Sequence, residues 1–255
     1  MTSRTRTHAL VTTGATALLL VALSGCGSGT DGAPAEQKSF PYSGKALTID
    51  SGNSRVDVVP ADVEQIEVTR RVDGWVVFGS GPDATWKLEG GTLTLKVKCS
   101  AVISNCDAHH EVKVPRGTAL TVDADNGKVT ASGFATPLKL SAGNGEVVVR
   151  DSSGPLELTA DNGSVLAERV SGASVVARSE NGEVTLGFSR VPDLVDTASD
   201  NGSITIGLPA SGGAYAVSAS AANGEVHVDV PRSEDSKHVV KARSENGEVN
   251  VRTAN

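Results

Sequence analysis

The stretch "ADNGKV" at residues 124–129 is the first of seven similar segments in this chain of 255 residues. Each segment contains Asn-Gly, and a Val or Ile stands two positions after the glycine. The pairs are Asn126-Gly127, Asn144-Gly145, Asn162-Gly163, Asn181-Gly182, Asn201-Gly202, Asn223-Gly224 and Asn246-Gly247. Successive asparagines are 18, 18, 19, 20, 22 and 23 residues apart. A repeat of about 20 residues is typical of proteins that stack one small structural unit.

The residues on either side of Asn-Gly keep their size class in every unit. Leu or Val stands six positions before the asparagine, Ala or Ser stands two before it, and Val or Ile stands three after it. Side chains of a straight strand alternate between two faces with a period of two. The step from two before to three after is odd, so the chain must turn at Asn-Gly. We call these turns the Asn-Gly corners.

Two all-β architectures satisfy this pattern. In an antiparallel β-sandwich, each Asn-Gly would close a two-residue hairpin, for which it is the favoured type I′ pair. In a β-solenoid, each unit of about 18–23 residues would be one coil, with Asn and Gly accepting a left-handed backbone at the corner. The match of residue size, position by position, favours the solenoid, because like residues then stack on like. The asparagine side chains would form a ladder along the corner.

The first 25 residues predict a lipoprotein signal peptide. Arg4 and Arg6 precede a short apolar run, and Leu23-Ser24-Gly25-Cys26 resembles a bacterial lipobox. The resemblance implies cleavage before Cys26 and a diacylglycerol on its sulfur, which supplies the two acyl chains that stable anchoring needs. A plain secretory signal with an incidental cysteine is the alternative. We therefore expect a protein anchored by lipid on the extracytoplasmic face of the cell membrane.

The net charge narrows the range of partners. It is −7 for the whole chain, and removal of residues 1–25, which hold two arginines and no acid, would bring it to −9. An acidic protein is a poor ligand for nucleic acid and for anionic lipid. We expect the membrane to be contacted through the lipid anchor, and a cell-wall glycan or an envelope protein to be the partner.

Composition divides the rest of the chain into three parts. Residues 26–38 are polar and rich in small residues, which predicts a flexible tether. Residues 39–117 form a less regular β region, in which "LTIDSGNSRVDV" at 47–58 resembles a diverged repeat unit. Residues 118–255 are the repeat with its seven corners. Three aromatic residues of the irregular region should fill its core or cap the repeat, or else form an exposed binding surface, and they are Trp75, Phe78 and Trp86.

Cys99 and Cys106 predict a disulfide within the irregular region. An even pair of cysteines outside the cytoplasm is usually oxidised. Metal binding together with His109 and His110 is the alternative, although the CxxC spacing of zinc sites is absent.

Acidic residues flank the corners in unit after unit. Those before Asn-Gly are weak candidates for a calcium site, and they are Asp125, Asp161, Glu180, Asp200 and Glu245. The simpler interpretation is a solvated, charged edge. Active sites are usually singular, whereas these acids recur, and no phosphate loop or catalytic motif is present. We expect no enzyme activity and no cofactor, with a glycan-active solenoid enzyme as a remote alternative.

A lipobox, a cysteine pair shortly before "VPRGT" at 114–118, and a run of "NG-x-V" units together resemble the bacterial DUF4097 family. Its members are β-strand-repeat proteins that are also labelled candidate adhesins. The resemblance implies an extracytoplasmic, envelope-associated and non-catalytic protein. The function expected is an adhesin-like scaffold or binding module. The alternative is a regulatory or sensing partner of an envelope-stress membrane system.

Overall fold

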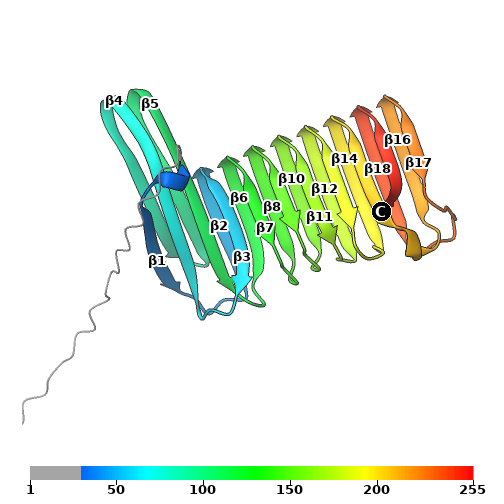
Figure 1. Cartoon of the computed structure of the whole chain (residues 1–255), viewed down its shortest axis with the longest axis horizontal. Coiled ribbons are helices and arrows are strands. Elements are labelled where there is room, and N and C mark those ends of the chain that lie inside the picture. Colours follow the sequence, from blue (N-terminus) through cyan, green and yellow to red (C-terminus); the bar gives the residue numbers. More distant parts are fainter. Residues whose placement is uncertain (1–29, 255) are drawn as a thin grey trace, which may run out of the picture.

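The computed structural model describes residues 30–254, and these residues form an all-β chain arranged as a long solenoid (Figure 1). Strands of the repeat pair in parallel with the equivalent strands of neighbouring coils. Parallel pairing confirms the predicted β-solenoid and excludes the hairpin sandwich, in which Asn-Gly would join two antiparallel neighbours. No helix in this part of the chain has the length and apolar character needed to cross a membrane.

Each coil of the repeat consists of two strands joined at an Asn-Gly corner. The strands that end at the corners form the first sheet, and they are β6 (Ala119–Asn126), β8 (Leu138–Asn144), β10 (Leu156–Asn162), β12 (Ser174–Asn181), β14 (Leu194–Asn201), β16 (Ala216–Asn223) and β18 (Val239–Asn246). The strands that follow the corners form the second sheet, and they are β7 (Val129–Ser132), β9 (Val147–Arg150), β11 (Val165–Val170), β13 (Val184–Phe188), β15 (Ile204–Pro209), β17 (Val226–Asp229) and β19 (Val249–Ala254).

The core lies between the two sheets and is built from equivalent layers. In one coil, Leu138, Leu140 and Ala142 of β8 are buried and face Val147 and Val149 of β9. Equivalent residues of the next coils lie directly above and below them in the parallel register. The small residue two positions before the asparagine fits because the sheets converge at the corner. This is the reason for the fixed size classes in the sequence.

The asparagine side chains form a continuous ladder of hydrogen bonds along the corners. The Nδ2 of Asn144 donates to the Oδ1 of Asn126 at 2.9 Å, and the Nδ2 of Asn162 donates to the Oδ1 of Asn144 at 3.1 Å. The same bond joins, in spatial order, Asn53, Asn126, Asn144, Asn162, Asn181, Asn201, Asn246 and Asn223. Because each inner amide both donates and accepts, the ladder favours a single register between coils.

The corner glycines are required by the close approach of neighbouring backbones, and the expected left-handed corner is wrong for most units. Of the corner residues, only Gly127 (φ 117°) and Gly247 (φ 158°) have a φ in or near the range that disfavours other residues. A Cβ atom on Gly163 would lie 1.9 Å from the carbonyl oxygen of Gly145, and one on Gly182 would lie 2.2 Å from that of Gly163. Atoms at these distances overlap, so no larger residue fits without moving a coil.

A further coil and a long hairpin precede the repeat. β2 (Ala46–Asn53) and β3 (Arg55–Ala61) stack on β6 and β7, as expected for a diverged unit. β4 (Gln65–Glu89) and β5 (Thr92–Pro115) pair antiparallel, while the two ends of β5 stack in parallel on β2 and β3. β1 (Ala35–Pro41) pairs antiparallel with β4. The hairpin and β1 thus close this end of the solenoid.

Regular structure is present within the stretch predicted to be a tether, residues 26–38. A short 3-10 turn, η1 (Thr30–Gly32), and the first residues of β1 lie inside the stretch expected to be a tether. The backbone partners of β1 come from β4, far along the sequence, so local composition gave no sign of them. Cys26 and the predicted signal peptide lie outside the described residues.

The middle portions of β4 and β5 leave the stack and form a projection, residues 73–82 and 98–107, which we call the arm. Figure 1 shows β4 and β5 rising beyond the line of corners. The predicted disulfide between Cys99 and Cys106 is present in the arm, with the two Cα atoms 6.4 Å apart. Trp75 and Phe78 also lie on the arm and are exposed, so the expectation that they fill the core is wrong. Trp86, below the arm, is partly buried against the core.

The last coil of the chain is not the last coil of the solenoid. β18 lies between β14 and β16, and β19 lies between β15 and β17 (Figure 1). The chain skips one coil position after β15, builds β16 and β17, and then returns to fill the gap. The two longest repeat spacings, 22 and 23 residues, belong to these crossings. The extra residues in these two units therefore serve to pass over a coil and come back.

His110 is a buried titratable residue in the closed end. It lies on β5 opposite Val56 of β3 and Arg70 of β4, and it is fully buried. Neither ring nitrogen has a hydrogen-bond partner among the described residues. Burial lowers the pKa of His110 to about 4, and the positive charge of Arg70 and the neighbouring His109 act in the same direction.

We predict that the chain loses stability as the pH falls from about 6.5 to about 4. Between these values the unfolded chain binds a proton at His110 that the folded chain does not, which favours unfolding. The full loss is of the order of 3 kcal/mol, at about 1.4 kcal/mol for each pKa unit. Urea unfolding at a series of pH values measures it.

His110→Leu should flatten the pH dependence in this range, because the substituted side chain does not titrate. Val112→Ala is the matched control, since Val112 is buried on the same strand, β5, and its substitution removes no titratable group. An equal slope in the wild type and in His110→Leu would contradict the assignment.

Candidate functional site

The acidic residues beside the corners form an exposed and interrupted row. In spatial order the positions before the asparagines are Asp125, Gly143, Asp161, Glu180, Asp200, Glu245 and Ala222. The five carboxylates among them are all exposed. Within residues 30–254, no three or more acidic, histidine or cysteine side chains are grouped so that they could hold a metal ion. The structure therefore does not bring the calcium candidates together as a site, and the row is a solvated edge.

The cysteines and histidines of the irregular region do not meet either. Cys99 and Cys106 are joined in the arm, whereas His109 lies on the second sheet with its Nε2 2.8 Å from the Oδ2 of Asp57. Burial tends to raise the pKa of Asp57, but hydrogen bonds from His109, Arg55 and Thr130 outweigh it and lower the pKa to about 2. The zinc alternative is thus replaced by a disulfide and a carboxylate–histidine pair.

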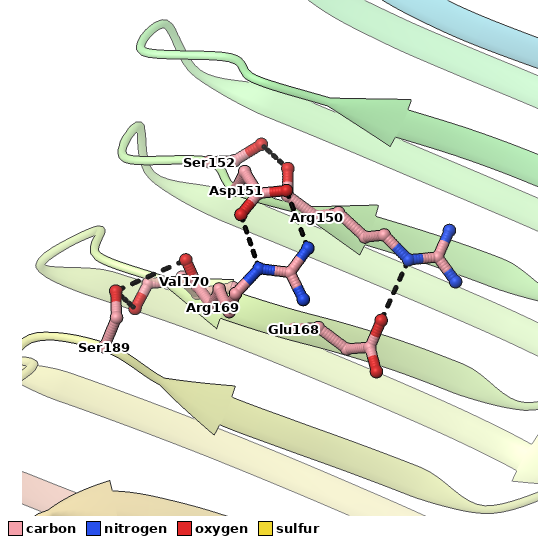
Figure 2. A network of polar contacts seen from close by, with 7 residues as sticks. All are labelled: Arg150, Asp151, Ser152, Glu168, Arg169, Val170 and Ser189. Atoms are coloured by element: carbon pink, nitrogen blue, oxygen red, sulfur yellow. Dashed lines mark hydrogen bonds and ion pairs between the residues drawn. The ribbon is translucent and has the colours of Figure 1, made fainter.

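Pairs of opposite charge join neighbouring coils along the exposed surfaces. Figure 2 shows Arg169 reaching back to Asp151 at 2.6 Å, and Arg150 reaching forward to Glu168 at 2.8 Å. Each pair is separated by 18 residues, which is the local repeat length. The hydrogen bond from Arg169 holds the pKa of Asp151 below its usual value. Exposed ion pairs add little stability, but an alternation of sign disfavours a shifted register.

Left-handed backbone occurs at the edge opposite the Asn-Gly corners. Asp151 and Arg169 have φ values of 51° and 52°, and Gly133, at the same place in the preceding coil, has 78°. Ser189 follows in the next coil and donates to the carbonyl oxygens of Arg169 and Val170 (Figure 2). The left-handed backbone expected at the Asn-Gly corners thus occurs in these coils at the opposite edge, where two of the three residues are neither Asn nor Gly.

A shallow groove crosses the outer face of the first sheet near the start of the strands. It spans β2, β6, β8, β10 and β12, and its lining residues are Ala46, Ala119, Leu120, Thr121, Pro137, Leu138, Lys139, Pro155, Leu156, Glu157, Ser174 and Val176. Five of these stand seven positions before a ladder asparagine, and they are Ala46, Ala119, Pro137, Pro155 and Ser174. Small residues and prolines at this position leave the groove open. We call it the cross-strand groove.

Polar side chains lie beside the small residues and prolines of the cross-strand groove. Lys139 donates to the Oε1 of Glu157 on the next strand at 2.5 Å, which raises the pKa of Lys139. Thr121 adds a hydroxyl one coil earlier. The groove was not predicted from the sequence, although Pro137 and Pro155, 18 residues apart, were a visible signal.

A buried arginine supports the base of the arm. The guanidinium of Arg70 lies over the ring of Trp86, with Cζ 4.0 Å from the ring centroid. It also donates to the carbonyl oxygen of Ala84 at 3.1 Å and to the carboxylate of Glu36. These contacts tie β1 and both halves of β4 together below the arm.

Comparison with solved structures finds similar chains, including the following three. A candidate cell adhesion protein from Clostridium sporogenes is 12% identical, with a TM-score of 0.41, 86% of this chain covered and 99% of that one. A candidate adhesin from Bacteroides fragilis is 13% identical, with a TM-score of 0.43 and coverage of 86% and 97%. A candidate adhesin from Parabacteroides merdae is 12% identical, with a TM-score of 0.44 and coverage of 87% and 96%.

The sequence of the chain matches the model of one protein family. No curated protein matches the chain. The family model described as Toastrack DUF4097 matches residues 118–255, which are more than half of the chain and contain all seven Asn-Gly corners. The chain belongs to the Toastrack DUF4097 family.

Proposed function

We propose that the chain is a lipid-anchored, extracytoplasmic envelope protein whose solenoid is a non-catalytic, adhesin-like scaffold or binding module. The observation that carries this proposal is the cross-strand groove, which runs over five stacked strands of the first sheet. Adjacent strands of a sheet are about 4.8 Å apart, so the groove offers side chains at short, regular intervals. Solenoids commonly bind extended ligands along such surfaces.

The chemistry of the groove suits a neutral or zwitterionic polymer, such as a cell-wall glycan. Its floor is formed by small residues and prolines, and Thr121, Lys139 and Glu157 supply hydroxyl, ammonium and carboxylate groups along it. Lys139 and Glu157 neutralise each other, so the groove has no strong charge of its own. An extended ligand would meet a different polar group on each successive coil, at the regular spacing of the strands.

Two observations support a location outside the cytoplasm. The disulfide between Cys99 and Cys106 is of a kind that persists in oxidising compartments. The lipobox ending at Cys26 supplies an export signal and a lipid attachment site in the sequence.

We predict that Cys26→Ala moves the protein from the membrane fraction to the soluble extracytoplasmic fraction, because the acyl chains have no other attachment site. Fractionation of cells expressing the wild type or the variant measures this, and Cys26→Ser should behave like Cys26→Ala. Retention of both variants in membranes at the wild-type level would contradict lipid anchoring.

We predict that the released Cys26→Ala protein is retained on purified cell wall, and that Ala119→Arg in this background reduces retention at least tenfold, about 1.4 kcal/mol. Ala119 lies in the groove on β6, and a long charged side chain there would fill it. Thr185→Arg, on β13 of the other sheet, is the matched control and should bind normally. Equal retention of the two arginine variants would contradict binding in the groove.

A further inference from the structure

The tip of the arm exposes an unusual group of apolar side chains. Phe78 is 90% exposed, Trp75 is 54% exposed and Val77 is 38% exposed. The other exposed large apolar residues in the described part of the chain, Val59 and Val226, stand singly elsewhere. Clustered exposed apolar groups mark a surface that meets a partner or a membrane, whereas single ones need no explanation.

The tip contains no charged side chain, whereas charged side chains lie at its base. The segments "GWVVFGSGP" at 74–82 and "CSAVISNC" at 99–106 contain no acidic or basic residue. Charges begin directly below, where Asp73 lies opposite Asp107 and Asp83 lies opposite Lys98. An apolar end followed by a charged belt suits the boundary between hydrocarbon and water, where tryptophan is also enriched.

The tip has regular secondary structure. Its backbone is paired across the hairpin, with Trp75 opposite Asn105 and Val77 opposite Ile103. The pairing limits the number of backbone groups that would lose hydrogen bonds on leaving water. At the apex, Phe78 has a φ of 54°, which is uncommon for a bulky residue and holds its ring outward.

The direction of β1 places the anchor on the same side as the tip. β1 is antiparallel to β4, with Ala35 opposite Arg71, so the chain before Ala35 comes from the direction of the tip. Seven residues of strand separate Arg71 from Phe78, roughly 23 Å. On the way to Cys26, η1 (Thr30–Gly32) lies against β4 and β5, and the four residue steps from Thr30 to Cys26 can span about 13 Å. Cys26 and its acyl chains can therefore lie on the same side of the solenoid as the tip.

We propose that the tip of the arm, through Trp75, Val77 and Phe78, inserts into the extracytoplasmic leaflet of the membrane that holds the lipid anchor. A second attachment point restricts the tilt of a rigid body more than a single point does. The arm thereby limits the range of orientations that the solenoid can take at the bilayer. This inference goes beyond the proposed function and uses it only for the lipid on Cys26.

Fluorescence of Trp75 on vesicles tests the insertion. The mature chain that begins at residue 26, with Cys26→Ala and Trp86→Phe, lacks the apolar leader and has Trp75 as its single tryptophan. With excess vesicles of phosphatidylcholine and phosphatidylglycerol, its emission should shift to the blue and be quenched by brominated acyl chains. High salt should leave both effects intact, because the tip is uncharged. Phe78→Ser should weaken partitioning about tenfold, and Val226→Ser, at the far end of the solenoid, should not change it.

Two results would overturn the proposal. One is an emission spectrum that vesicles neither shift nor quench, in a protein whose melting temperature equals that of the parent. The other is a shift seen only with vesicles that contain membrane proteins, which would assign the tip to a protein partner. No acyl chain is present in this experiment, so its failure is distinct from a failure of lipid anchoring, which the fractionation of Cys26→Ala measures.

Discussion

At the Asn-Gly corners, the backbone of one coil lies so close to the next that no side chain fits between them. A Cβ on Gly163 would meet the carbonyl oxygen of Gly145 at 1.9 Å, and the contact recurs from coil to coil. This close approach fixes the distance and register of neighbouring coils. The asparagine ladder, the layered core and the ion pairs between coils depend on that register, because a slip would place each against the wrong partner.

Identical corners also make the coils interchangeable, which explains how the chain can build its last two out of order. Gly247 stacks on Gly202, and Gly224 stacks on Gly247, with the same close contacts as elsewhere. The asparagine ladder follows the same spatial order. The contacts at the corners therefore permit the last two coils to stack in either spatial order. The long segments that cross between these coils determine which order forms. The outcome is an open end formed by β16 and β17, while the hairpin closes the opposite end.

Periodicity in the sequence was sufficient to predict the solenoid, because the size of each residue is set by the layer in which it lies. The periodicity did not show why the corner glycines are needed. A left-handed backbone and a close contact between neighbouring backbones both require glycine, so both produce the same Asn-Gly pattern. Nor did the periodicity predict the order of the last coils, which depends on the path of two loops. Trp75 and Phe78 were misplaced because nothing local shows that β4 and β5 extend beyond the stack. The cross-strand groove was missed because Pro137 and Pro155 show only a repeated position, whereas the hollow forms when five such positions stack on neighbouring strands.

The central claim is that close backbone contact at the corners holds the solenoid in register. The most direct test is to measure the free energy of unfolding in urea for Gly163→Ala and for Gly187→Ala. Both place a methyl group on a glycine of the repeat, but the nearest atom to a Cβ on Gly187 is 3.7 Å away. Gly163→Ala should lose about 3 kcal/mol or more, whereas Gly187→Ala should be unchanged or slightly more stable. Equal stability of the two variants would contradict the account.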